Sequence, residues 1–288
     1  MGNDQADKLR ERLNAFHTKS KSIAVMSGKG GVGKSNFSLN FSLALQNVHK
    51  KVLLCDLDIG MGNIEILMGE SSTFTIVDFF EKNLSLKETI STSVIGLDYL
   101  SGGTGLGTIF RMNDRKFQRF LRELEQIMKE YDFIIFDMGA GISEDSLLFL
   151  LSVDEIIVIT TPEPTALTDA YAAIKHVCIN HDSTAFSIVV NRALNHSTGA
   201  AAFSRLQQTM SQFLKREASL LGIIPDDSAI LKAVIAQKPF IVYQPSSQAS
   251  KVISKMSKEY LKNQTFIFTE AEQAPFISKL KSFFVRGR

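Results

Sequence analysis

The sequence predicts an α/β fold in which helices flank a doubly wound, mostly parallel β-sheet. Short apolar runs of strand length alternate with helical patterns along most of the chain. This alternation is typical of parallel sheets that are covered by helices. Acidic or glycine-rich residues follow several of the runs, at the strand ends where such sheets bind ligands. With 288 residues, the chain is long enough for one large domain or two small ones.

Seven apolar runs are the candidate strands. The first, residues 22–27, is a short apolar run of the kind that forms a buried strand. The others are residues 51–56, 97–102, 132–138, 155–160, 185–191 and 219–225. Helical patterns lie between them, for example at 116–130 and 165–179, and a late surface helix is predicted at 245–263.

The chain is predicted to have three parts. Residues 1–20 are charged and contain a short amphipathic pattern formed by Ala6, Leu9, Leu13 and Phe16. Residues 21–263 contain all of the predicted strands. Residues 264–288 are expected to form a linker and a second amphipathic helix.

Composition narrows the class of protein. The net charge of +2 is lower than that of a general nucleic-acid binder, so no specific nucleic-acid partner is expected. Cys55 and Cys178 lie in apolar surroundings and are expected to be buried thiols in a reducing compartment. The polar N-terminus is unlike a signal peptide, and no apolar run reaches the roughly 18 residues of a membrane span. A cytoplasmic protein is the simplest expectation.

The strongest motif follows the first predicted strand and fits the phosphate-binding pattern G-x-x-x-x-G-K-[ST]. Glycines let backbone N–H groups turn toward phosphates, and the positive end of the next helix points at them. Lys34 is expected to reach the β- and γ-phosphates, and the Ser35 hydroxyl is expected to bind Mg²⁺. The alternative is a glycine-rich turn without a ligand. It is less consistent with a motif that follows a predicted strand and begins a predicted helix. The predicted nucleotide-binding residues here are Gly28, Lys29, Gly30, Gly31, Val32, Gly33, Lys34, Ser35 and Asn36.

Three carboxylates follow predicted strands that belong to the same sheet edge. Asp56 and Asp58 end the run at 51–56, and Asp137 ends the run at 132–138. A carboxylate beside a phosphate loop can hold Mg²⁺ or its water molecules, and another can orient an attacking water. The alternative is that these residues cap helices or turns, as Asp often does. Their common location favours the catalytic interpretation.

Together these residues resemble the MinD/ParA group of P-loop ATPases. That group carries the variant loop K-G-G-x-G-K-[ST], which residues 29–35 match, and the resemblance covers most of residues 21–245. The segment from Asp58 to Gly69 is similar to the first switch of MinD. Plasmid-partition proteins typically have Pro and Gln after the second Asp, and this chain does not. The cluster cysteines of nitrogenase iron proteins are also unmatched.

The resemblance implies a role for each matching residue. Lys29 would contact the nucleotide of the opposite subunit in a dimer held by ATP, and Asp58 would position the hydrolytic water. Ser35, Asp56 and Asp137 would serve Mg²⁺. Asn191 and Arg192 would lie at the adenine, and the backbone around Pro225 would pass close to the base. The implied catalytic residues are Lys29, Lys34 and Asp58, with ATP or ADP and Mg²⁺ as cofactors.

The N-terminus narrows the resemblance. Residues 4–10 read Asp-Gln-Ala-Asp-Lys-Leu-Arg, which is similar to the D-Q-A-x-x-L-R element of the FlhG (YlxH) family of flagellar-number ATPases. In that family the element stimulates the GTPase FlhF, so the resemblance implies Asp4, Gln5 and Ala6 as partner-activating residues. Flagellar switch (C-ring) proteins are implied as further partners. The alternatives are a MinD-type division-site ATPase, a ParA-type DNA-segregation ATPase and a metabolic kinase.

The C-terminal segment combines apolar residues at helical spacing with positive charge. Lys279, Lys281, Arg286 and Arg288 are basic, and no acidic residue follows Glu272. This composition favours an interfacial membrane helix that binds an anionic surface, and the MinD resemblance points the same way. The alternative is a terminal helix that packs on the domain. The predicted membrane-binding residues are Phe276, Ile277, Leu280, Phe283 and Phe284. Peripheral membrane association in the ATP state is the corresponding expectation.

Overall fold

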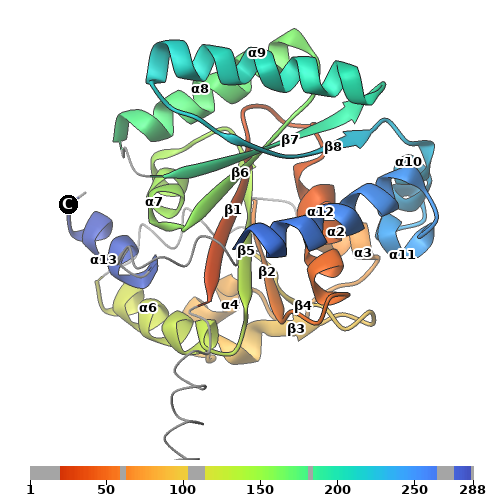
Figure 1. The fold of residues 1–288 in the computed structure, drawn as a ribbon. Helices are drawn as coiled ribbons and strands as arrows, with labels where there is room; N and C mark the ends of the chain where they lie inside the picture. Colours follow the sequence, from red (N-terminus) through yellow and green to blue (C-terminus); the bar gives the residue numbers. More distant parts are fainter. Residues whose placement is uncertain (1–19, 59–62, 103–113, 181–183, 265–275, 287–288) are drawn as a thin grey trace, which may run out of the picture.

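The computed structural model describes residues 20–58, 63–102, 114–180, 184–264 and 276–286. Within these ranges the strands form one sheet in the order β3-β4-β2-β5-β1-β6-β7-β8 (Figure 1). The only antiparallel pairing in that sheet joins β3 and β4. The strands are β1 (Lys21–Ser27), β2 (Val52–Leu57), β3 (Ile90–Thr92), β4 (Asp98–Leu100), β5 (Phe133–Ala140), β6 (Glu155–Thr160), β7 (Ala185–Ala193) and β8 (Ser219–Pro225).

Helices cover both faces of the sheet, and alternate residues of β1 show how the core divides. Ala24 and Met26 belong to one apolar cluster, while Ile23 and Val25 belong to the other. The first face carries α4 (Ile76–Glu81), α6 (Asp114–Met128), α7 (Glu144–Ser152), α8 (Pro164–Asn180), α9 (His196–Leu214) and α13 (Phe276–Arg286). The second face carries α2 (Lys34–Gln46), α3 (Asn63–Met68), α10 (Ser228–Ile235), α11 (Phe240–Tyr243) and α12 (Gln248–Gln264). A 3-10 turn, η1, spans Lys87–Thr89.

The predicted fold class is confirmed, and each of the seven predicted strands is present. Most of these strands were recognisable because helices on both faces bury them, which selects continuous apolar runs. The edge strand β8 is buried less. The sequence analysis did not predict β3, which has only three residues and lies at the edge of the sheet. The helical patterns at 116–130, 165–179 and 245–263 correspond to α6, α8 and α12.

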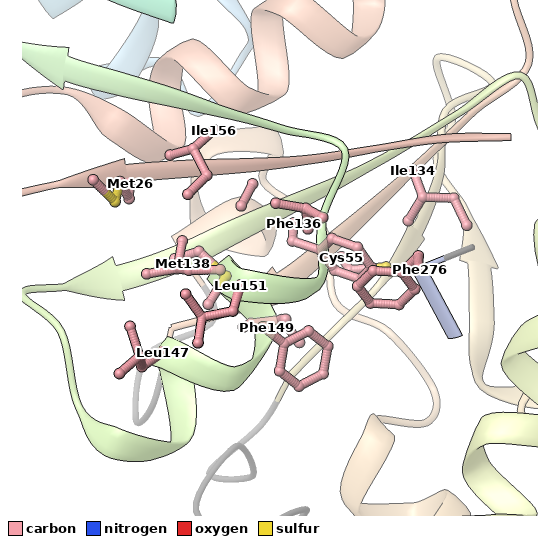
Figure 2. Packing of buried hydrophobic residues seen from close by; sticks show 14 of the residues in the cluster. Met26, Cys55, Ile134, Phe136, Met138, Leu147, Phe149, Leu151, Ile156 and Phe276 are labelled. Atoms are coloured by element: carbon pink, nitrogen blue, oxygen red, sulfur yellow. The ribbon is translucent and has the colours of Figure 1, made fainter. Parts of the chain in front are cut away.

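The C-terminal helix α13 packs on the body of the protein, against α6 and α7. Phe276 is 1% exposed and Leu280 is fully buried, and both belong to the core on that face. The ring of Phe276 stacks on Phe136 with centroids 5.3 Å apart, and lies 6.1 Å from the ring of Phe149 (Figure 2). In this structure the apolar face of α13 is therefore covered by the domain and is not exposed for membrane binding.

The docked helix changes what the five predicted membrane-binding residues can do in this state. Phe276 and Leu280 are covered by protein, and Ile277 and Phe283 are partly buried against the same core. Phe284 lies in α13, but its side chain is outside the described part. Membrane binding through this face therefore stays a prediction that requires α13 to leave its groove. Among the described helices, none has the length and apolar character needed to cross a bilayer.

Two other predicted features fall outside the described residues. The N-terminal element with Asp4, Gln5 and Ala6 lies before residue 20, and most of the predicted linker lies at 265–275. Both stay predictions.

Candidate functional site

The phosphate loop joins β1 to α2 and has the geometry that the sequence motif predicts. Gly31 and Gly33 have φ values of 77° and 93°, in the left-handed region that glycine adopts without strain. Gly28 faces the backbone of Asp169 in α8 so closely that a Cβ atom would collide with it. Helix α2 then begins at Lys34, so its N-terminal N–H groups and its positive dipole end face the loop. This arrangement is an anion-binding site suited to a chain of phosphates.

Lys34 is buried, with 6% of its side chain exposed, and contacts two of the predicted acidic residues. Its Nζ lies 3.1 Å from Oδ1 of Asp137 and 3.8 Å from Oδ2 of Asp58. The hydroxyl of Ser38 also donates to Oδ1 of Asp137, at 2.9 Å. The sheet therefore gathers the loop lysine and the strand-end carboxylates at one place, as predicted.

Asp56 and Asp137 are neighbours in the register of β2 and β5, and both are buried. Burial and the nearby Asp137 charge raise the pKa of Asp56 to about 7, although backbone N–H groups of Ile64 and Asp58 stabilise its charged form. Burial also raises the pKa of Asp137, against the opposing effect of Lys34. Two desolvated carboxylates side by side are an arrangement that a divalent cation stabilises.

A magnesium ion fits these residues. Oδ2 of Asp137 is buried and has no hydrogen-bond partner among the described groups, so an ion or its bound water can satisfy it. Hydroxyl and carboxylate oxygens are the ligands that Mg²⁺ prefers. Ser35, Asp56 and Asp137 would hold the ion, directly or through its water molecules, and the ion would neutralise charge on the phosphates.

Asp58 lies at the end of β2, beside the loop and half exposed. Its Oδ2 accepts a hydrogen bond from Nδ2 of Asn63 in α3, at 3.0 Å. Its Oδ1 faces Gly139, where an added Cβ atom would approach to 3.1 Å. Asn63 thus orients the Asp58 carboxylate, and the missing side chain of Gly139 leaves space beside it. A group that positions a water molecule for reaction needs both features.

A cleft of about 410 Å³ opens beside the loop, between α2, the end of β7 and α10–α11. Asn191 and Arg192, the residues expected at the adenine, line it together with Gly33 and Asn36. Pro225 itself is not in the lining, but both of its chain neighbours, Ile224 and Asp226, are. A partly apolar cleft next to a phosphate loop is suited to a nucleotide base.

Asn191 has a second role that the sequence did not reveal. Its Nδ2 donates to the carbonyl of Val32 in the phosphate loop at 2.8 Å, and its Oδ1 accepts from the backbone of Arg192 at 2.9 Å. It is 6% exposed. The residue that walls the cleft therefore also fixes the loop, through a contact between segments far apart in the chain.

Lys29 does not point at the cleft of its own subunit. Its Nζ lies 2.7 Å from Oε2 of Glu163 and 3.2 Å from Oγ1 of Thr165, at the start of α8. The hydrogen bond from Lys29 lowers the pKa of Glu163. The side chains of Lys29 and Glu163 are 31% and 60% exposed, so this ion pair contributes little to stability and is easily broken. Sequence reasoning missed Glu163 as the partner because the two residues are distant in sequence.

The raised pKa of Asp56 predicts how its replacement changes stability without magnesium. In the unfolded chain a carboxyl of this kind titrates near pH 4, whereas in the folded protein it titrates at about 7. The wild type therefore loses stability as pH rises through that window, because folding there requires proton uptake. Asp56→Asn removes the titrating carboxyl and therefore this loss of stability, and it keeps an oxygen that can accept a hydrogen bond from the backbone N–H of Ile64.

We expect Asp56→Asn to be more stable than the wild type at pH 8, and to have a smaller advantage at pH 5. Urea unfolding at both pH values, in the presence of a chelator, measures the two differences. Equal differences at pH 5 and pH 8 would show that Asp56 does not titrate as described.

The chain matches one family and is similar to several known proteins. Residues 18–261 match the ParA family, described as the NUBPL iron-transfer P-loop NTPase. The antiactivator FleN of Pseudomonas aeruginosa is 30% identical over 237 residues, which cover 82% of this chain and 85% of FleN. The flagellum site-determining protein YlxH of Helicobacter pylori is 31% identical over 294 residues, which cover 99% of this chain and 98% of YlxH.

Among solved structures, MinD of Pyrococcus horikoshii complexed with Mg-ADP matches with a TM-score of 0.66. The match covers 86% of this chain and 98% of MinD. At 23% identity, this likeness shows a shared fold.

Proposed function

The chain belongs to the MinD/ParA family of P-loop ATPases, in the branch that includes FleN and YlxH, and on that premise we propose that it is an ATP-switched regulator of flagellar assembly. ATP and Mg²⁺ bind at the phosphate loop, close a homodimer and create surfaces for partners. Hydrolysis then returns the protein to the monomer. The observation that carries this proposal is the contact of Lys34 with Asp137 and Asp58 at the phosphate loop.

The resting position of Lys29 supports the dimer. In its own subunit the side chain is held by Glu163, away from the phosphate loop. The loop already has Lys34 for the β- and γ-phosphates. Lys29 is therefore available to contact the nucleotide of another subunit. A phosphate group of that nucleotide would compete with the exposed Glu163 carboxylate for the Lys29 ammonium group.

Replacing Lys29 tests the dimer directly. We expect Lys29→Ala to bind ATP about as well as the wild type, because Lys34 and the loop backbone are unchanged, and to lose dimerisation with a non-hydrolysable ATP analogue. Sedimentation velocity measures the dimer, and a fluorescent nucleotide measures binding. Lys51→Ala is the matched control, since Lys51 is exposed at the opposite end of β2 and should leave the dimer intact. A stable dimer of Lys29→Ala would rule out a cross-subunit lysine.

The flagellar part of the proposal is supported by the relatives, one named as an antiactivator and the other as a flagellum site-determining protein. It is also supported by the N-terminal D-Q-A-x-x-L-R element in residues 4–10. FlhF and the C-ring proteins are the partners that we propose on this basis. The proposed location is cytoplasmic, with peripheral membrane association through α13 in the ATP state.

The N-terminal element should act on its GTPase partner independently of the ATPase domain. A polar residue at the start of an amphipathic helix can order a catalytic water in a partner, as Gln does in other GTPases. We therefore expect a peptide of residues 1–20 to accelerate GTP hydrolysis by purified FlhF. A Gln5→Ala peptide should accelerate it much less. Phosphate release measures both rates, and no acceleration by the wild-type peptide would remove the main argument for FlhF as a partner.

A further inference from the structure

Asn40 is a fully buried amide in the helix that follows the phosphate loop, and all of its hydrogen-bonding groups point at two neighbours. Its Nδ2 donates to the backbone oxygen of Asn36 at 2.8 Å and to the side-chain oxygen of Asn36 at 2.9 Å. Its Oδ1 accepts from the backbone N–H of Ile241 at 3.0 Å. A buried amide is costly unless it is paired in this way.

One partner of Asn40 lines the cleft, and the other directly follows a residue that lines it. Asn36 lines it directly, one residue after the predicted magnesium ligand Ser35. Ile241 follows Phe240, which lines the cleft from the other side and is 2% exposed. Asn40 thus joins the side of the cleft built by α2 to the side built by α11, across some 200 positions of sequence.

Helix α11 has only four residues, and it depends on such contacts for its position. The first N–H groups of a helix have no partner within it, and the side chain of Asn40 satisfies the N–H of Ile241. On the other side, the hydroxyl of Ser250 in α12 donates to the carbonyl of Phe240 at 3.0 Å. The backbone that carries Phe240 is therefore anchored from both α2 and α12.

We infer that Asn40 is a positioning residue for base binding, which holds Asn36 and Phe240 in the arrangement that receives the base. This inference rests on the proposed function, since it assumes that the cleft binds a nucleotide. It goes further, because it says that the part of the site that receives the base and the part that receives the phosphates are positioned by different residues. Asn191 lines the cleft and also fixes the phosphate loop, together with the glycines, whereas Asn40 supports only the part of the wall built by Asn36 and Phe240.

Inorganic triphosphate separates the two supports, because it carries the phosphates without the base. We expect Asn40→Ala to bind ATP about tenfold more weakly, the loss expected when a buried hydrogen-bonded amide is removed, and to bind triphosphate as the wild type does. At saturating ATP, kcat should be unchanged, so the effect should appear in KM.

Asn40→Asp keeps an oxygen that can accept from Ile241, but its ionised carboxylate would face the two oxygens of Asn36 with no proton to donate. It should lower the ratio of ATP to triphosphate affinity at least as much as Asn40→Ala does. Phe240→Leu tests the same wall without touching α2 and should lower ATP affinity alone. Ser257→Ala is the matched control: its buried hydroxyl joins α12 to the carbonyl of Ala44 in α2, away from the cleft, and its removal should leave both affinities unchanged.

Each outcome decides the inference. Equal losses for ATP and triphosphate in Asn40→Ala would show that α2 has loosened as a whole, and unchanged ATP affinity would show that Asn40 has no role in the cleft. Either result overturns the inference. If Asn40→Ala does not fold, the comparison of Asn40→Asp and Phe240→Leu with the control decides in the same way. Failure of the proposed function is distinct, because the wild type would then bind neither ligand.

Discussion

Asp58→Ala is expected to bind ATP and Mg²⁺ but to hydrolyse ATP about 100- to 10,000-fold more slowly than the wild type, the range lost when a group that activates water is removed. Asp58 is the half-exposed carboxylate of the site, oriented by Asn63 and lying beside Gly139. The loop glycines and Lys34 are unchanged in the variant, so the phosphate cradle should remain intact. The variant should therefore accumulate as an ATP-bound dimer.

Phosphate release measures the rate, and sedimentation in ATP measures the dimer. Asn63→Ala is the companion variant, because it removes the hydrogen bond that orients Asp58 and leaves the carboxylate in place. It should slow hydrolysis less than Asp58→Ala does. Normal turnover by Asp58→Ala would show that another group activates the water.

Deleting residues 275–288 is expected to abolish binding to anionic vesicles while nucleotide binding is retained. The segment supplies apolar residues and basic charge, and a single short helix of this kind binds membranes only weakly. Binding by the intact chain should therefore weaken as salt increases and should need the dimer, which presents two helices at once. Vesicle sedimentation with and without a non-hydrolysable ATP analogue measures both effects. Full binding by the truncated chain would place the membrane contact elsewhere.

The docked position of α13 adds a condition to this prediction. Burial of an aromatic or aliphatic side chain stabilises the docked helix by about 1.5–3 kcal/mol for each residue, and an aromatic pair adds about 0.5–1.5 kcal/mol. The membrane must replace the burial of Phe276 and Leu280 before the helix leaves its groove. Phe149→Leu removes one of the two aromatic contacts of Phe276, leaves its stack on Phe136 and does not change α13. It should raise vesicle binding in the absence of ATP, and unchanged binding would show that undocking does not limit membrane contact.

The phosphate site could be predicted because its chemistry is local in sequence. The loop motif, the strand before it and the helix after it are contiguous, and Asp56, Asp58 and Asp137 directly follow apolar runs. Parallel strands bring such ends together at one edge of the sheet. The same logic identified the long buried strands but not β3, whose three residues carry no periodicity.

The contacts between distant segments could not be predicted. Nothing in the spacing of Lys29 and Glu163, or of Asn191 and Val32, indicates that they meet, because the sheet topology decides it. The C-terminal helix illustrates a different limit. An amphipathic pattern predicts that one helix face contacts an apolar partner. The pattern is the same whether that partner is a membrane or a groove between helices. The structure shows the groove occupied.

The central place of β1 has a consequence for how the chain is made. It leaves the ribosome well before its two neighbours in the sheet, because β5 and β6 follow more than a hundred residues later. Until they are synthesised, the apolar residues Ile23–Met26 have no strand to pair with on either side. An unpaired apolar strand invites association with other chains. Newly made chains that end before Phe133 should therefore depend on chaperones to remain soluble, and this dependence should fall as β5, β6 and the later elements are synthesised.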